Sequence, residues 1–371
     1  MYSDLYTARL PEEYAGLTLL TKAGVRGFPG LDEAQDLLMR VLEAPPLPLE
    51  GPLIDLTAMS GISGRLFDDL SPTLVERSCA ALRVLRAQYA DEEDVQVLAA
   101  LPPDLSGEYA TLLAVLPGDR GNEAVAELLR AAHRLARPGA VLYLAGDKNR
   151  GFERYFKWAR TLFGEGEILE RHKGLRIAAL RNTAQTQPET EPPPSTYRFL
   201  DVTVASRPGV FSADRPDAAS TLLLEHLGDV AGRRLLDLGC GTGLLGAVAA
   251  RRGARVTLLD DDLGAVAASR DTLRLSGLEG RVLHSDVGSA LGADERFDLV
   301  ITNPPFHVGS DLVLEVAAEF IETAARHLEP GGELWLVANQ FLPYEPLLQG
   351  WANPSEVART RSFKLLRARR T

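Results

Sequence analysis

A stiff turn follows an apolar run in the second half of the chain, in the segment LVITNPPFHVG from Leu299 to Gly309. The run is typical of a buried strand, and Pro304 and Pro305 end it because proline has no N–H to donate and fixes φ. The turn therefore holds the Asn303 amide and the ring of Phe306 at a strand end. An amide oxygen could accept a hydrogen bond from an amino group, while an aromatic ring could stack on the flat ring system that carries it.

A glycine-rich loop is the second segment with residue types suited to ligand binding, LLDLGCGTGLLG from Leu235 to Gly246. Its last six residues match GxGxxG, so a nicotinamide dinucleotide must be considered, although a lone match is weak evidence. Asp237 argues against it, because a carboxylate there would repel a pyrophosphate and would suit a cationic ligand with an amino group. Glycines let the backbone approach a flat, bulky ligand. The glycines in question are Gly239, Gly241 and Gly243.

Acidic residues also end the next two predicted strands. RVTLLDDD reaches Asp260 and continues with Asp261 and Asp262, and VLHSDVG places Asp286 after the third strand. Each aspartate alone is explained equally well by an ordinary turn or a helix cap, and Asp262 fits a cap of the following helix. Because the carboxyl ends of parallel strands meet at one edge of a sheet, acids at three successive strand ends indicate a common ligand site.

The surrounding pattern alternates between strands and helices. We expect strands near residues 234–238, 255–260, 281–285, 297–302 and 333–338, and helices near 214–228, 243–252, 262–276 and 311–328. This alternation predicts a mostly parallel sheet with helices on both faces, whose ligands bind at the carboxyl ends of the strands. Pro330-Gly331-Gly332 predicts a turn before the fifth strand, and the alternating tail from Ser355 could add antiparallel strands at the edge.

The first half of the chain repeats sequence patterns of the second half in the same order. Three parallel segments occur in the same order: 52–67 with 234–249, 109–118 with 297–306, and 131–146 with 324–339. They indicate an internal duplication of one α/β unit, the alternative being two unrelated α/β domains. Thr57 and Met59 stand where the second copy has glycines, and Val115 and Leu116 stand where it has the Asn-Pro turn. We therefore expect the first half to be structural or substrate-binding.

Length and composition predict two domains, because 371 residues exceed the usual size of a single core. The polar, Pro-rich segment 182–197 is expected to be an extended linker between a domain at 1–181 and a domain at 198–371. The net charge of -11 argues against wholesale coating of nucleic acid, but it leaves room for a local basic patch.

Other features limit the cofactors and the compartment. The two cysteines lie far apart in sequence, which indicates no disulfide framework and fits a reducing cytosol. The six histidines show no metal-type spacing, so we expect no metal. No apolar run approaches the roughly 18 residues of a membrane span, and the N-terminus lacks the pattern of a signal peptide. We therefore expect a monomeric cytoplasmic protein with no membrane partner.

The Asp-x-Gly-x-Gly-x-Gly pattern resembles the first motif of class I S-adenosylmethionine-dependent methyltransferases. With the duplication, it implies an α/β fold of two tandem Rossmann-like class I methyltransferase domains, the N-terminal one degenerate. In that family the acid at Asp260 accepts the ribose hydroxyls, and the acid at Asp286 faces the adenine amino group. The resemblance implies S-adenosyl-L-methionine as cofactor and no reactivity for the loop cysteine. The implied cofactor-binding residues are Phe211, Asp237, Gly239, Cys240, Gly241, Gly243, Asp260, Asp261, Asp286, Val287 and Asn303.

The Asn-Pro-Pro-aromatic turn resembles the motif of amino-methyltransferases that act on adenine, guanine, cytosine or a protein glutamine, so it implies the reaction and not the substrate. A nucleobase amine is a poor nucleophile because its lone pair is delocalised into the ring. The Asn303 side chain and the Pro304 carbonyl would hold that amine for in-line transfer. The implied catalytic residues are Asn303, Pro304, Pro305 and Phe306, the last stacking on the base.

The whole chain resembles the bacterial 16S ribosomal RNA guanine-N2 methyltransferases of the RsmC type. The resemblance rests on NPPFHVG followed by Asp311, on RPGVFS from Arg207 to Ser212, and on the degenerate copy in the first half. It implies methyl transfer to a guanine N2 amine in the small-subunit head, with 16S rRNA or the small subunit as partner. Arg207, Phe306 and His307 would bind substrate, although a surface arginine and a turn histidine explain two of them as well.

Several alternatives stay open. An adenine-N6 or protein-glutamine methyltransferase would keep the chemistry, but those families commonly carry tyrosine in place of Phe306 and lack the duplicated first half. A non-catalytic ribosome-assembly factor is a third possibility. Segment 146–160 interleaves basic and aromatic residues, which fits either an RNA-binding surface or an amphipathic helix with a buried aromatic face.

Overall fold

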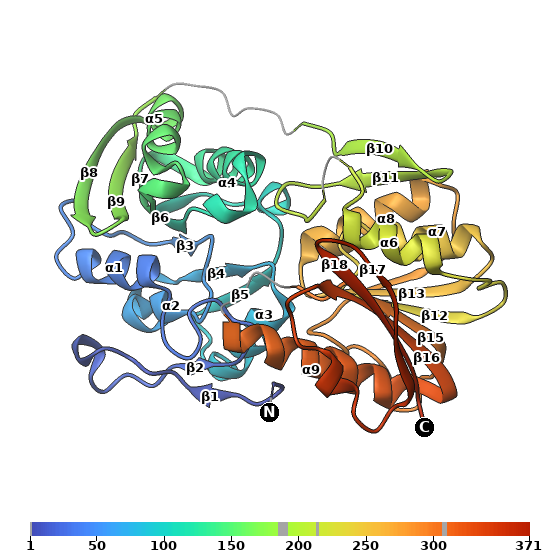
Figure 1. Cartoon of the computed structure of the whole chain (residues 1–371). Helices are drawn as coiled ribbons and strands as arrows, with labels where there is room; N and C mark the ends of the chain where they lie inside the picture. Colours follow the sequence, from blue (N-terminus) through green and yellow to red (C-terminus); the bar gives the residue numbers. More distant parts are fainter. Residues whose placement is uncertain (1, 185–191, 213–214, 306–309) are drawn as a thin grey trace. The chain divides into compact units, whose positions relative to one another are not determined.

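The computed structural model describes residues 2–184, 192–212, 215–305 and 310–371, the side chains of 310–313 excepted. The chain forms two units, Ser3–Pro193 and Pro194–Thr371 (Figure 1). Tyr2 belongs to the second unit. Regular structure enters the segment predicted as a linker, because β9 ends at Asn182 and β10 begins at Ser195. Both cysteines are free thiols. Within the described ranges, no helix combines the length and apolar character needed to cross a membrane.

The N-terminal unit is built on a seven-stranded sheet with the order β5-β4-β3-β6-β7-β9-β8. The strands are β3 (Leu53–Asp55), β4 (Thr73–Glu76), β5 (Gln96–Ala99), β6 (Tyr109–Val115), β7 (Ala136–Asp147), β8 (Gly164–His172) and β9 (Leu175–Asn182). The helices are α1 (Glu33–Leu42), α2 (Ile62–Leu66), α3 (Cys79–Gln88), α4 (Asn122–Leu135) and α5 (Phe152–Phe163). A short antiparallel pair, β1 (Tyr6–Thr7) and β2 (Leu20–Thr21), precedes them.

The C-terminal unit is built on a second seven-stranded sheet with the order β14-β13-β12-β15-β16-β18-β17. The strands are β12 (Arg234–Leu238), β13 (Arg255–Asp260), β14 (Arg281–His284), β15 (Phe297–Thr302), β16 (Leu328–Asn339), β17 (Ala352–Arg359) and β18 (Phe363–Arg369). The helices are α6 (Ala218–His226), α7 (Leu244–Arg251), α8 (Leu263–Leu275) and α9 (Ser310–His327). The antiparallel pair β10 (Ser195–Phe199) and β11 (Val202–Ser206) precedes α6.

The two sheets have the same topology. In each, the first five strands pair in parallel, and the last two add antiparallel pairings at one side. This confirms the predicted fold class of two Rossmann-like domains. It also confirms the antiparallel strands expected from the C-terminal tail.

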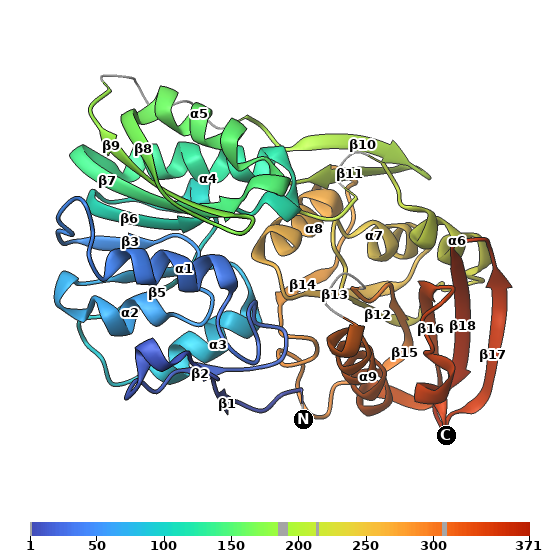
Figure 2. The same ribbon diagram turned by 60° about the vertical axis from the view of Figure 1, so that its left-hand side comes forward.

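The core of the C-terminal unit follows the alternation of side chains along each strand. Leu235 and Ile301 lie in a cluster with residues of α6, α7 and α8, whereas Leu236 and Val300 lie in a cluster with residues of α9. Figure 2 shows α9 on the opposite side of this sheet from those three helices. The central strands are buried on both faces, which explains why they read as continuous apolar runs rather than as alternating patterns.

Three local features of the C-terminal unit add detail to the sequence expectations. The helix predicted near 214–228 begins only at Ala218, because the Asp217 side chain caps it by accepting from Ser220 N at 2.9 Å. The Pro330–Gly332 turn falls inside β16, where the register with β15 is irregular. The edge strand β17 pairs with β18 through two register shifts, and it is mostly exposed.

Helix α7 packs so tightly on the sheet that a methyl group is excluded at Gly246. A Cβ built there would lie 2.8 Å from the Leu258 side chain. We expect Gly246→Ala to lower the free energy of unfolding by about 1–3 kcal/mol, because overpacking exceeds the gain in helix propensity. Chemical unfolding measures this. The control is Gly228→Ala, whose Cβ would meet nothing within 4 Å; a loss of equal size there would contradict the packing argument.

Candidate active site

The carboxyl ends of four parallel strands gather the predicted residues at one edge of the C-terminal sheet. Leu238, at the end of β12, pairs with Leu259 of β13 and with Thr302 of β15. Asp260 pairs with His284 at the end of β14. Asp237, Asp260, Asp286 and Asn303 therefore come from adjacent strand ends, as the sheet rule for ligand sites requires.

Asp237 is a fully buried carboxyl group with one oxygen held by the protein. Its Oδ2 accepts from Gly246 N at 2.8 Å, whereas its Oδ1 has no hydrogen-bond partner among the described residues. The pKa of Asp237 is raised to about 7, because the effect of burial, with a smaller one from the charge of Asp260, exceeds the lowering effect of the Gly246 hydrogen bond. A buried acceptor of this kind fits a ligand that brings its own N–H or positive charge.

The glycine loop leaves open space where a side chain would stand. Gly241 has a φ of +55°, and a Cβ built on it would meet nothing within 4 Å. Its N–H donates to Asp260 Oδ2 at 2.8 Å, and its carbonyl accepts from Ser269 Oγ at 3.0 Å. Gly243, at φ +76°, lies so close to Ser269 that a Cβ would approach it at 2.8 Å. The loop is thus held against α8, and Gly239 shares the left-handed conformation.

The three consecutive aspartates after β13 have separate contacts. Asp260 accepts from Gly241 N through Oδ2 and from Asp262 N through Oδ1, at 2.8 and 2.9 Å. Asp262 caps α8, as its sequence context predicted. The Asp261 carbonyl contacts a His284 ring nitrogen at 2.7 Å. The Asp260 carboxylate therefore shapes the loop in addition to any contact it makes with a ligand.

Asp286 and Val287 follow β14 in an unusual backbone conformation. Val287 is buried at a φ of +50°, which is strained for a β-branched residue, and Ser285 Oγ donates to its carbonyl at 2.8 Å. Tyr2 packs against the cluster that contains Val287, and its hydroxyl hydrogen-bonds to Asp286. Burial first, and then that carboxylate, raises the pKa of Tyr2. Sequence reasoning missed Tyr2, because it belongs to no motif.

The side chain of Asn303 is held by a hydrogen bond to the N-terminus of α6. Its Nδ2 donates to Asp217 Oδ1 at 3.3 Å, and Asp217 is the N-cap of α6. The strand end before it is anchored by Thr302 Oγ1, which donates to the Leu238 carbonyl at 2.6 Å. Pro304 is buried. Pro305 is exposed, and the predicted residues Phe306 and His307 lie outside the described residues.

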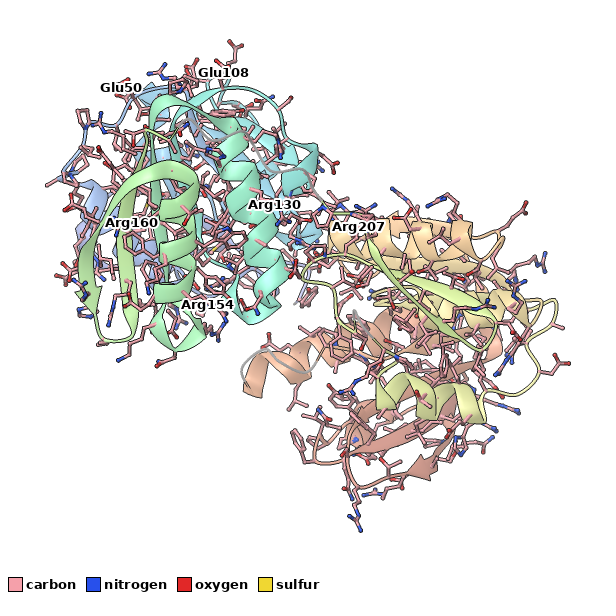
Figure 3. All side chains as sticks on the ribbon, turned by 90° about the horizontal axis from the view of Figure 1, so that it is seen from above. Glu50, Glu108, Arg130, Arg154, Arg160 and Arg207 are labelled. Atoms are coloured by element: carbon pink, nitrogen blue, oxygen red, sulfur yellow. The ribbon has the colours of Figure 1, made fainter. Side chains whose placement is uncertain are left out.

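A cleft of about 800 Å³ opens beside Asp217, the hydrogen-bond partner of Asn303. We call it the α6 cleft. Phe211, Arg215, Asp217, Thr221 and Thr360 are among its lining residues, and Phe211 is 52% exposed. Arg207, which lies just after β11, is engaged elsewhere, because its Nη2 pairs with Asp271 Oδ2 of α8 at 2.8 Å (Figure 3). A second hollow, of about 640 Å³, includes Arg234 and Phe297 and lies at the opposite, amino edge of the sheet. The α6 cleft therefore adjoins the predicted site, whereas the second hollow does not.

Cys240 is buried in the glycine loop. Its Sγ lies 3.2 Å from Ser269 Oγ, and burial raises the pKa of the thiol. A raised pKa keeps the sulfur protonated, so the loop cysteine has the character of a small packing residue and not of a nucleophile. Within the described ranges, no group of three or more His, Cys, Asp or Glu side chains is arranged to hold a metal ion.

The equivalent position in the N-terminal unit is closed. Asp55 ends β3 as Asp237 ends β12, but both its oxygens have partners: Ser63 Oγ donates at 2.6 Å and Thr57 N at 3.0 Å. The Thr57 hydroxyl accepts from Val115 N at 2.7 Å, and the Met59 side chain is buried nearby in the sequence. The first copy therefore satisfies internally the groups that the second leaves available to a ligand.

The basic and aromatic residues of α5 differ in exposure. Phe152, Tyr155 and Phe156 are buried in the core of the N-terminal unit. Arg154 and Arg160, which lie along the helix in Figure 3, are exposed, and their guanidinium groups lie over the rings of Tyr155 and Phe156. These three aromatic residues thus belong to an amphipathic helix and are not available to stack on bases, whereas the basic residues remain accessible.

Comparison with known proteins gives consistent matches. The family model described as Methyltransferase small domain matches residues 201–367. The ribosomal RNA small subunit methyltransferase C of Pseudomonas entomophila is 39% identical over 274 residues, 71% of this chain and 80% of that protein. Its Pseudomonas putida counterpart is 36% identical over 335 residues, 86% of this chain and 93% of that protein. The solved structure of the T. thermophilus 16S rRNA N2 G1207 methyltransferase (RsmC), in complex with AdoMet and guanosine, is 38% identical, with a TM-score of 0.88 and coverage of 100% of this chain and 99% of that one.

The raised pKa of Asp237 makes stability depend on pH. The pKa is about 7 in the folded chain against an ordinary 3.8, so the folded state binds this proton more tightly. The stabilisation is fully present below about pH 4 and is lost as pH rises through 7. We expect Asp237→Asn to unfold at a higher temperature than wild type at pH 8, by an amount that shrinks toward pH 5.

Asp298→Asn is the matched control, because hydrogen bonding to Arg234 lowers the pKa of Asp298. Its contribution is present above its ordinary pKa, so it does not change between pH 5 and pH 8. Thermal unfolding of both variants at pH 5, 6, 7 and 8 measures the difference. A gap between Asp237→Asn and wild type that stays constant across this range would contradict the pKa argument.

Proposed function

Because this chain belongs to the ribosomal RNA small subunit methyltransferase C family, we propose that the residues at the carboxyl edge of its C-terminal sheet carry out that family's reaction. The chain is a methyltransferase that uses S-adenosylmethionine and modifies the exocyclic N2 amine of a guanine in 16S rRNA. One observation carries this assignment: the likeness extends over the whole chain to a structure solved with AdoMet and guanosine. The roles of individual residues are our proposal.

The cofactor is proposed to lie across the glycine loop. When bound, S-adenosylmethionine supplies a methyl group made electrophilic by a sulfonium. The unpartnered Oδ1 of Asp237 and the open space at Gly241 support this placement. Asp260 and Asp286 would accept from the ribose and the adenine. The wider binding set is Phe211, Gly239, Cys240, Gly243, Asp261, Val287 and Asn303.

The guanine amine is proposed to be held by the turn after β15. The Asn303 Oδ1 and the Pro304 carbonyl would accept its two N–H bonds, which favours the pyramidal, partly positive nitrogen of the transition state. Pro305 would keep the turn rigid, and Phe306 would stack on the base. The α6 cleft adjoins this turn through Asp217, and its volume of about 800 Å³ is sufficient for a nucleoside. Arg207 and His307 remain candidates for contacts with the RNA.

The domains and the wider setting are also proposed. Residues 198–371 would form the catalytic domain, 182–197 the linker, and 1–181 a degenerate domain with a structural or RNA-binding role. The closed Asp55 position and the exposed basic residues of α5 support that division of labour. We propose that the enzyme acts as a cytoplasmic monomer without a metal ion. Its target would be the guanine that corresponds to G1207 of the T. thermophilus relative.

Replacing Asn303 tests the proposed acceptor. We expect Asn303→Ala to lower kcat by about 100-fold or more, as when one preorganised hydrogen-bonding group is removed from a transition state. The Kd for S-adenosylmethionine should rise by less than about tenfold, because Asn303 is only one of several residues proposed to hold the methyl donor. The assay transfers labelled methyl groups to undermethylated small subunits and identifies the product nucleoside.

Asn339→Ala is the matched control, because Asn339 ends the next strand, β16, along the same edge. It should keep wild-type activity. Label found on adenine or on protein would refute the guanine assignment. Full activity of Asn303→Ala would refute the role given to its amide.

Ionisation of Asp237 predicts how cofactor affinity varies with pH. A cationic ligand favours the ionised carboxylate, and the pKa of about 7 means that this form is scarce at pH 6. We expect the Kd to tighten by roughly fivefold to tenfold more between pH 6 and pH 8 in wild type than in Asp237→Asn. Isothermal titration with S-adenosylmethionine measures both proteins. Identical pH profiles would remove Asp237 from the cofactor site.

A further inference from the structure

We infer that Asp217 is a positioning residue, which fixes the amide of Asn303 in the one orientation that presents its oxygen to the substrate amine. The inference deepens the proposed function and rests on it. It concerns a residue that no motif in the sequence singles out. Its basis is the contact between Asp217 Oδ1 and Asn303 Nδ2, at 3.3 Å, between positions 86 residues apart.

Asp217 is itself held firmly before it meets Asn303. Its Oδ1 also accepts from Ser220 N at 2.9 Å, and its backbone carbonyl accepts from Thr221 N at 3.0 Å and from Thr221 Oγ1 at 2.9 Å. These contacts belong to the first turn of α6, whose inner face is packed in the core. A side chain supported by a helix end can impose a geometry on its neighbour.

The chemistry of an amide explains why orientation needs a second residue. Its C=O and NH₂ ends have nearly the same shape, so packing alone hardly distinguishes the two orientations. An ionised carboxylate only accepts hydrogen bonds, so Asp217 pairs with the NH₂ end of Asn303 and repels the oxygen end. Reversal of the amide would bring two oxygens together. The contact therefore directs Asn303 Oδ1 away from Asp217.

This orientation matters because the two ends of the amide have opposite effects on the reaction. A nitrogen that attacks a sulfonium methyl gains positive charge and keeps its N–H bonds, so an acceptor beside it lowers the barrier. If the amide were reversed, its NH₂ group would face the N–H bonds of the substrate amine, and two hydrogen-bond donors would oppose each other. The carboxylate also polarises the amide through the hydrogen bond, which makes its oxygen a better acceptor. Asp217 lines the α6 cleft, so it acts at the edge of the proposed nucleoside site.

A pair of substitutions separates positioning from helix capping. Serine is a good N-cap, so Asp217→Ser should keep α6 intact, but its hydroxyl is too short to reach Asn303. We expect kcat to fall roughly tenfold, with the melting temperature and the Kd for S-adenosylmethionine close to wild type. Asp217→Asn keeps an oxygen in the same place and should stay within about threefold of wild-type kcat.

A pair of variants in one chain provides a readout that a structural role would not move. Asn303→Ala removes the amide that Asp217 is proposed to orient. Adding Asp217→Ser to Asn303→Ala should lower kcat by less than about threefold further, because a residue that acts through Asn303 then has nothing to position. The control is Asp32→Ser at the N-cap of α1, where the side chain accepts from Ala34 N and Gln35 N. It should leave kcat unchanged.

The assay is the labelling of undermethylated small subunits by the full-length protein, with the product nucleoside identified. If the wild type labels guanine N2 but Asp217→Ser keeps full kcat, or lowers kcat as much in the Asn303→Ala background as in wild type, the inference is overturned while the function stands. If the wild type places no methyl group on guanine, the proposed function fails, and the inference fails with it.

Discussion

The hydrogen bond from Gly246 N to the buried Asp237 carboxylate ties together the three parts from which the C-terminal site is made. Asp237 belongs to the central strand β12, Gly246 to the first turn of α7, and the glycine loop connects them. This hydrogen bond fixes the distance between the two ends of the loop that crosses the sheet edge. The other oxygen of the carboxyl group has no hydrogen-bond partner among the described residues, and the proposed ligand would supply one.

The first half of the chain satisfies the same constraint internally. Asp55 occupies the matching strand end, but hydroxyl and backbone donors from Ser63 and Thr57 use both its oxygens. Burial still raises its pKa, to about 6. The two halves thus share a fold and an aspartate at the same strand end. They differ in whether both oxygens of that aspartate have hydrogen-bond partners within the protein. Duplication preserved the architecture, and a few side chains decided which copy could do chemistry.

The sequence predicted those features whose causes are local. Strand and helix alternation, the cap at Asp262 and the antiparallel tail arise from short patterns, and the structure has them at nearly the expected positions. The contact between Asp217 and Asn303 and the packing of Tyr2 on the acid-lined edge depend instead on residues distant in the chain. No periodic pattern in the sequence predicts such long-range contacts. The start of α6 could have been placed better, since aspartate is a preferred N-cap residue and Asp217 stands directly before the first residues of the helix.

The edge strand β17 bears on how the molecule behaves at high concentration. It carries Pro354, which cannot donate to a ladder, the charged pair Glu356 and Arg359, and two places where its register with β18 shifts. An added strand from another molecule would meet one missing donor, charged side chains and an irregular backbone. These features disfavour the pairing of a further strand with β17, although neither a closed barrel nor a helix covers this edge. A protein that modifies 16S rRNA can leave this edge strand uncovered and still resist aggregation.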